Sequence, residues 1–193
     1  MASSGPNSPG TGANDATVGT QAWNTPSRCT ANDTTYTYIS LPNSGSATSN
    51  YLVATNFGFA ISAGATIDGI VVEVNRQSGQ TVKDYQVKII KGGTIGSTDK
   101  ADTATAWPNF TGAYKSYGGS SDLWGETWTD SDINSSTFGA AFSGTTASPG
   151  AGVEGYVDHI RITVYYTASI AGQPMALRQS QARQGFARVG RGF

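Results

Sequence analysis

Charged residues are scarce in this chain. They make up 13% of its 193 residues, about half the share of an ordinary soluble domain. Leucine is also rare, and no long run of strong helix formers occurs, which argues against a helical fold. Glycine is abundant at 25 residues, and hydrophobic residues reach 37%, which is enough for a core. This balance is typical of short strands joined by many turns.

Other features are missing as well. Cys29 is the single cysteine, so one chain can form neither an internal disulfide nor a thiolate metal cluster. The first residues lack the basic and apolar regions of a secretory signal. No segment approaches the ~18 consecutive apolar residues of a membrane span. We therefore expect synthesis in the cytosol, no membrane partner, no metal and no cofactor.

Residues 168–193 differ from the rest of the chain in charge. They contain four arginines and no acidic residue, so they carry +4 and leave −5 for residues 1–167 in a chain of net charge −1. Apolar side chains are interleaved with the arginines. We interpret the segment as a basic arm that binds a partner, with a floppy solubilising tail as the alternative. The candidate contact residues of the arm are Leu177, Arg178, Arg183, Phe186, Arg188, Val189, Arg191 and Phe193.

The arm predicts an acidic protein partner rather than nucleic acid. Four positive charges are few, and the acidic body would repel a polyanion. The glycine patterns that cradle phosphates or dinucleotides are also absent from the sequence.

The chain divides into three parts. Residues 1–20 are mostly Gly, Pro, Ser, Asn and Thr with few apolar anchors, which predicts an extended N-terminal arm. Residues 21–167 contain short alternating runs separated by turn residues, the pattern of a β-sandwich. We therefore expect one sandwich domain over residues 21–167, between the N-terminal arm and the basic arm of residues 168–193.

The clearest predicted strand covers residues 156–166. Tyr156, Ile160 and Ile162 fall on one face, and His159 falls on the other. His159 is the single histidine, and no nucleophile motif accompanies it. We interpret it as an exposed strand residue rather than a catalytic one.

Residues 68–76 and 81–91 form two further predicted strands. In the second, Tyr85 is expected inward and Asp84 outward. The short link at residues 78–80 predicts that the two strands form a hairpin.

Weaker alternation predicts strands at residues 34–41, 51–59, 113–117 and 137–143, with a short strand near 21–23. The total of about eight strands fits an all-β, jelly-roll-like sandwich. Thr129 and Asp132 have the spacing of a capping box, which predicts one or two helical turns through Asn134.

Three tryptophans are candidate binding residues. Trp107, Trp124 and Trp128 lie in an aromatic-rich stretch that suits, in this order, the core, a subunit interface or a sugar-stacking platform. Glu126 with Asp130 or Asp132 could serve a glycosidase. The same carboxylates suit a helix cap and a loop equally, so we predict no catalytic residues and no enzyme.

Several segments carry a resemblance when taken as a set. They are DLWGETWT (122–129), DIN (132–134), FG (138–139), VDHIRITVYY (157–166) and ATIDGIVVEV (65–74). With them, residues 20–167 resemble virion structural proteins of tailed bacteriophages.

The resemblance implies a β-sandwich exposed on a particle, such as a capsid decoration (cement) protein or a fibre or neck component. It implies virion localisation, no catalytic residues, and other virion proteins as partners. We expect a homo-oligomer, with a trimer favoured. The alternative function is a carbohydrate-binding or host-recognition module of a phage fibre or neck.

Overall fold

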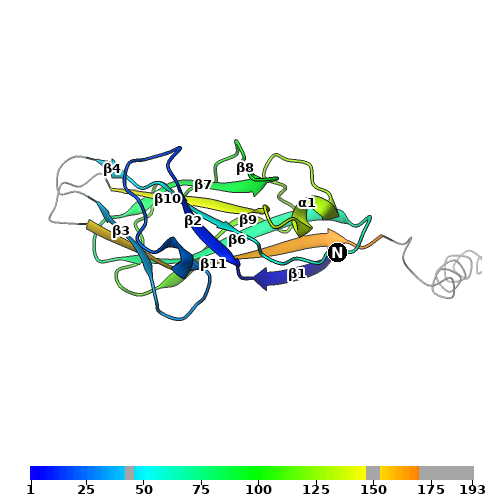
Figure 1. Cartoon of the computed structure of the whole chain (residues 1–193), viewed down its shortest axis with the longest axis horizontal. Helices are drawn as coiled ribbons and strands as arrows, with labels where there is room; N and C mark the ends of the chain where they lie inside the picture. Colours follow the sequence, from blue (N-terminus) through cyan, green and yellow to red (C-terminus); the bar gives the residue numbers. More distant parts are fainter. Residues whose placement is uncertain (42–45, 147–152, 170–193) are drawn as a thin grey trace, which may run out of the picture.

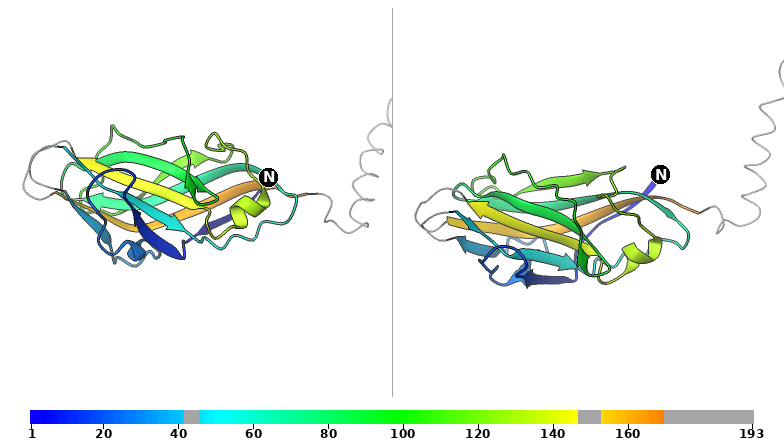
Figure 2. Two further views of the ribbon diagram at one scale, coloured as in Figure 1. Left: turned by 45° about the horizontal axis from the view of Figure 1, so that its top comes forward. Right: turned by 90° about the horizontal axis from the view of Figure 1, so that it is seen from above.

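Two antiparallel sheets pack face to face in the computed structural model of the chain, which describes residues 1–41, 46–146 and 153–169. Figure 1 and Figure 2 show the two layers stacked along an elongated body. The predicted all-β sandwich is therefore confirmed. The described residues contain more strands than the eight expected, because several short strands at the edges carry little hydrophobic pattern.

The first sheet, called sheet A, has β11 at its centre. Its strand order is β1-β11-β6-β9, with β3 also paired to β11. The strands are β1 (Ala2–Asn7), β3 (Thr37–Leu41), β6 (Thr66–Ser78), β9 (Ala113–Gly119) and β11 (Val153–Thr167).

The second sheet, called sheet B, has the order β2-β5-β10-β7-β8, with β4 also paired to β10. Its strands are β2 (Thr11–Asp15), β4 (Ala47–Thr48), β5 (Tyr51–Thr55), β7 (Lys83–Lys91), β8 (Thr94–Ile95) and β10 (Gly139–Thr146). The described helices are η1 (Pro26–Cys29) and α1 (Asp130–Asn134). The predicted capping box at Thr129 is confirmed at the start of α1.

The extended arm expected over residues 1–20 is corrected by the structure. β1 pairs with β11 and β2 pairs with β5, so this segment contributes an edge strand to each sheet. An edge strand is held mainly by backbone hydrogen bonds, which any residue except proline can donate. Small polar residues therefore suffice, and the hydrophobic pattern that reveals an inner strand is missing.

The hairpin expected between residues 68–76 and 81–91 is also wrong. β6 lies in sheet A and β7 in sheet B, so the short link between them crosses from one layer to the other. Both edges of β6 are occupied, by β11 and β9, so β6 has no free edge with which to pair β7.

Two bulges reverse the expected side-chain directions. In β7 the register against β10 shifts at Tyr85, so Asp84 is fully buried and Tyr85 is 39% exposed. In β11 the register against β6 shifts at Asp158. Residues on the two sides of a bulge lose the simple alternation, and Tyr156 therefore points outward while Ile160 points inward.

The core is one continuous cluster between the sheets. Its fully buried side chains include Ile70, Val72, Ile160 and Ile162 from sheet A, and Phe142 from sheet B. No helix in the described part of the chain is long and apolar enough to cross a membrane.

Candidate functional site

The two ends of the described sandwich lie side by side. β1 and β11 are antiparallel neighbours, with Ala2 opposite Tyr166. Figure 1 shows Met1 and the end of β11 at the same pole of the body, which we call the terminal pole. Residues 168–193 therefore begin at a defined end of a rigid domain. The eight arm residues, Leu177, Arg178, Arg183, Phe186, Arg188, Val189, Arg191 and Phe193, lie outside the described residues.

A buried ion pair joins the two sheets at the other end. Arg76 Nε lies 3.0 Å from Asp84 Oδ1, and the side chains are 3% and 0% exposed. Tyr117 Oη and Trp107 Nε1 each donate to Asp84 at 2.8 Å. The Asp102 amide donates at 3.1 Å. Burial and the neighbouring carboxylate raise the pKa of Tyr117. The bonds of this cluster are made within the protein, so it is a structural element, and the sequence prediction that Asp84 points outward is wrong.

Two of the three candidate tryptophans belong to the core. Trp107 is 3% exposed and Trp124 1% exposed. Trp107 Nε1 donates to Asp84, and Trp124 Nε1 donates to the carbonyl of Ile70 at 3.0 Å. This corrects the interface and glycan interpretations of both residues, because neither ring face reaches the surface. The core, ranked first for them, is where they lie.

Trp128 is the third candidate and is only partly buried. Its Nε1 donates to the carbonyl of Leu123 at 3.0 Å, and its ring meets Phe138 edge-on with centroids 5.4 Å apart. Lys91 Nζ lies 5.5 Å from the ring centroid. Trp128 therefore closes the core beside α1 and keeps some surface exposed.

The carboxylates considered for hydrolysis have structural contacts. Asp132 completes the cap of α1 and lies 3.4 Å from Lys91 Nζ. Burial opposes ionisation of Asp132, but the bonds from Thr129 and the charge of Lys91 outweigh it and lower its pKa. Asp130 Oδ1 accepts from the Gly64 amide at 3.1 Å. A glycosidase acid needs a raised pKa, which Asp132 does not have.

His159 is buried rather than exposed, contrary to expectation. It is 5% exposed, with Nδ1 2.8 Å from Tyr114 Oη and Nε2 2.9 Å from Ser8 Oγ. Burial and the charge of Arg161 lower its pKa. A neutral imidazole has one donor and one acceptor nitrogen, which two hydroxyls can satisfy. The sequence could not reveal this because Ser8 comes from the segment expected to be an arm.

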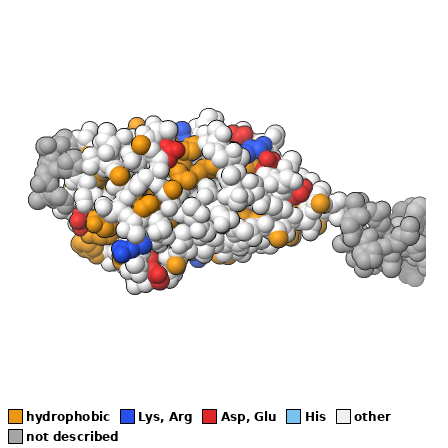
Figure 3. All heavy atoms as spheres, in the orientation of Figure 1, with side chains coloured by type: hydrophobic (Ala, Val, Ile, Leu, Met, Phe, Trp, Pro, Cys, Tyr) orange, Lys and Arg blue, Asp and Glu red, His pale blue; other side chains and the backbone are white. Residues whose placement is uncertain are grey.

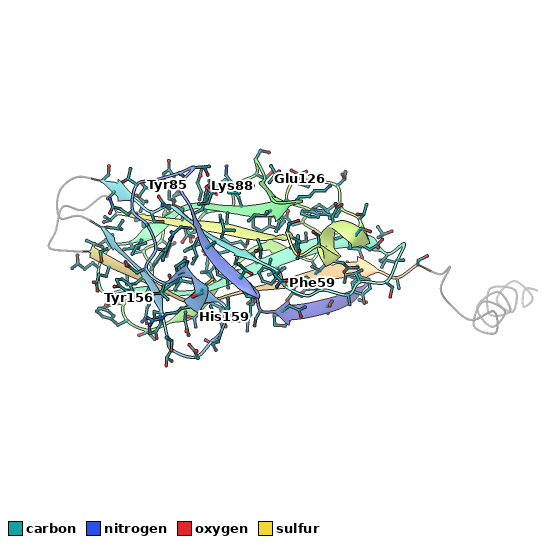
Figure 4. The ribbon with its side chains drawn as sticks, viewed as in Figure 1. Phe59, Tyr85, Lys88, Glu126, Tyr156 and His159 are labelled. Atoms are coloured by element: carbon teal, nitrogen blue, oxygen red, sulfur yellow. The ribbon has the colours of Figure 1, made fainter. Side chains whose placement is uncertain are left out.

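An aromatic cluster that sequence reasoning missed lies at the pole far from the termini. Tyr36, Tyr38 and Phe110 each have ring centroids 5.8–6.3 Å from that of Tyr156. Figure 4 labels Tyr156 toward the end of the body that lies far from the N-terminus marked in Figure 1, and Figure 3 shows hydrophobic side chains gathered at that end. We call these four residues the distal aromatic cluster. The spacing of Tyr36 and Tyr38 was the only signal in the sequence, since the other two rings arrive from distant segments.

Two further features complete the surface. A shallow hollow of about 150 Å³ lies on the outer side of sheet B and is lined in part by Val53, Ile90 and Ile95. Among the described residues, no group of three or more His, Cys, Asp or Glu side chains could hold a metal ion.

Comparison with known proteins gave no significant match to a family model, a curated protein or a solved structure.

Proposed function

We propose that the chain is a non-enzymatic structural protein of a tailed-phage virion, most simply a capsid decoration (cement) protein. Its sandwich would assemble as a homo-oligomer, with a trimer favoured, and residues 168–193 would anchor it to the shell or to neighbouring subunits. One observation carries the proposal: β1 begins and β11 ends at the terminal pole. An arm that starts there leaves the rest of the sandwich projecting from the particle.

Charge supports an arm that binds a neighbour. Residues 168–193 carry +4 and residues 1–167 carry −5, so the arm of one subunit is complementary to the body of another. About 25 extended residues span on the order of 80 Å, which is long enough to cross a neighbouring sandwich. A capsid surface with acidic grooves would offer the same complementarity.

The test compares the full chain with a chain that ends at residue 169. We expect light scattering to give an oligomeric mass for the full chain and a monomeric mass for the truncated one. Purified capsids of the phage that encodes the protein should co-sediment with the full chain alone. Circular dichroism should show the same β content for both chains.

A full-length control separates charge from length. The variant with Arg178, Arg183, Arg188 and Arg191 changed to Gln keeps every apolar residue of the arm. We expect it to associate weakly, and association of the native chain to weaken with added salt. Full loading of the truncated chain onto capsids would overturn the anchoring role of the arm.

A further inference from the structure

We infer that the distal aromatic cluster binds neutral pyranose oligosaccharides, with Phe110 and Tyr156 as the stacking rings. This goes beyond the proposed function, because anchoring at the terminal pole neither requires nor provides such binding. Tyr156 and Tyr166 are ten residues apart on β11, or roughly 33 Å. The site therefore faces away from whatever holds the terminal pole.

The cluster is built on a row of paired strands. Tyr38 on β3 lies opposite Tyr156 on β11, and Tyr156 lies opposite Gln77 on β6. The ring of Tyr38 is inclined at 37° to Tyr156 and that of Phe110 at 48°, while Tyr36 meets it at 74°. Tyr156 is thus the centre of a surface with ring faces turned in several directions.

Phe110 is exposed and yet held in place. It is 65% exposed, and its backbone has φ 45°, a left-handed conformation that is costly for a bulky residue. Its amide donates to the carbonyl of Ser78 at 3.4 Å, and its ring lies so close to Gly79 that a Cβ there would collide with it. Strain of this kind is found at binding sites, where a side chain is fixed for a ligand.

The central ring is also fixed. The Tyr156 hydroxyl donates to the Glu154 carboxylate. This bond, followed by burial, raises the pKa of Tyr156 to about 12, so the ring stays neutral over the working range of pH. A rigid, neutral aromatic ring with a polar end loses little conformational entropy when it binds.

Polar side chains lie near the cluster on β6, where Asn75 comes two residues before Gln77, the residue opposite Tyr156. Asn75 Nδ2 donates to Asn32 Oδ1 at 3.1 Å and to Asp158 Oδ2 at 3.4 Å, which fixes the orientation of the amide. Its Oδ1 is the buried side-chain atom left without a partner in the described chain. Gly112, two residues after Phe110, lies against this oxygen and near that of Gln77, because a Cβ there would be 2.9 Å and 3.6 Å from them.

An unpartnered acceptor is uncommon and needs an explanation. The segment at residues 110–112 contains Phe110, whose backbone is left-handed, and Gly112, which lies against Asn75 Oδ1. A hydroxyl-rich ligand that shifts this segment would satisfy the oxygen. Sugars combine hydroxyl donors with apolar ring faces, and aromatic residues with a polar end suit both.

A sugar fits this surface better than a protein does. A stable protein interface covers about 800 Å² on each partner and excludes charge from its centre. Here four rings are bordered by Glu154, which contacts Tyr156, and by Arg28, whose Nη1 donates to the Tyr36 carbonyl at 3.3 Å. A group of four rings with charged residues at its border matches a short oligosaccharide.

The experiment uses the full chain on an array of bacterial O-polysaccharides and capsular polysaccharides, together with cellohexaose and maltohexaose. The strongest binder is then titrated by calorimetry against three variants. Phe110→Ser should weaken binding about tenfold or more, which is about 1.4 kcal/mol. Phe110→Tyr keeps an aromatic ring and should retain most of the affinity.

Tyr85→Ser is the matched control, because Tyr85 is an exposed aromatic residue on the other sheet at 39% exposure. It should bind like the native chain. Absence of binding to every probe at millimolar concentration would overturn the inference, as would equal binding by Phe110→Ser. Self-association lost in Phe110→Ser without any glycan binding would assign the cluster to a protein contact and also overturn it.

The two proposals fail separately. The chain that ends at residue 169 should lose capsid association and keep glycan binding, whereas Phe110→Ser should do the reverse.

Discussion

A single buried carboxylate, that of Asp84, holds several side chains together between the two sheets. Asp84 is fully buried and accepts hydrogen bonds from Arg76, Trp107, Tyr117 and the Asp102 amide. These bonds replace the water that a carboxylate loses on burial. The same environment makes the pair sensitive to losing either partner.

Removing Arg76 should therefore be costly. We expect Arg76→Met to lower the free energy of unfolding by about 3–5 kcal/mol, since it leaves an uncompensated buried charge. Urea denaturation followed by tryptophan fluorescence measures the change. Lys115→Met is the control, because Lys115 is 42% exposed in its pair with Asp102 and should change stability by less than about 1 kcal/mol. Similar losses for both variants would contradict a special role for the buried pair.

The buried histidine gives the protein an acid sensitivity. The pKa of His159 is lowered from its ordinary value of 6.5, first by burial and then by Arg161. Below pH 6.5 the unfolded chain takes up a proton that the folded chain resists, so stability falls as the pH falls from about 7 to about 5. We expect His159→Gln to lose this part of the pH dependence in urea titrations at the two pH values.

Asp158 also contributes to the pH dependence of stability, so the contribution of His159 has to be measured by comparing the native chain with His159→Gln. Burial raises the pKa of Asp158, so the folded state binds its proton more readily and gains stability as the pH falls toward that pKa. This trend is opposite in sign to that of His159. The same pH slope in the native chain and in His159→Gln would show that His159 does not contribute.

At the scale of elements, the edge strands matter more than their composition suggests. β1 covers the edge of β11 that β6 leaves free, from Tyr166 to Ile162. Ser8, which follows β1, forms a hydrogen bond with His159. An uncovered strand edge is open to pairing with other chains. Residues that looked like a leader therefore protect the central strand of sheet A.

Deleting residues 1–9 should lower the melting temperature and promote aggregation. An arm outside the fold would leave both unchanged, so the result separates the two descriptions of this segment. Thermal unfolding followed by circular dichroism and light scattering provides the measurement. Both chains in this comparison, with and without residues 1–9, end at residue 169, so that assembly through the basic arm contributes to neither melting temperature.

At the scale of the whole molecule, one core cluster spans both sheets and includes Cys29, Trp23, Trp107 and Trp124. A single shared core predicts one cooperative unfolding transition. Burial raises the pKa of the Cys29 thiol to about 12, and only the thiolate reacts readily with disulfide reagents. The thiol should thus report on the opening of the whole sandwich.

We expect Cys29 to resist a thiol reagent at pH 8 in the native protein. Its labelling should rise over the same range of urea as the change in tryptophan fluorescence. Labelling at much lower urea would mean that the region around η1 opens separately from the rest of the core.

The sequence by itself determined the fold class, the inner strands and the cap of α1. Alternation of apolar residues at period two follows directly from strand geometry, and a capping box is a local pattern. It also ranked Trp107 and Trp124 first as core residues. These features depend on neighbours in the chain, so they can be predicted without the tertiary structure.

The tertiary structure alone decided the rest. Pairing of β1 and β2, the crossing from β6 to β7, and the bulges at Tyr85 and Asp158 depend on which strand edges are free, and hydrophobic pattern does not encode that. The distal aromatic cluster unites residues from position 36 to position 156. Such a site exists only when strands far apart in sequence become neighbours in one sheet.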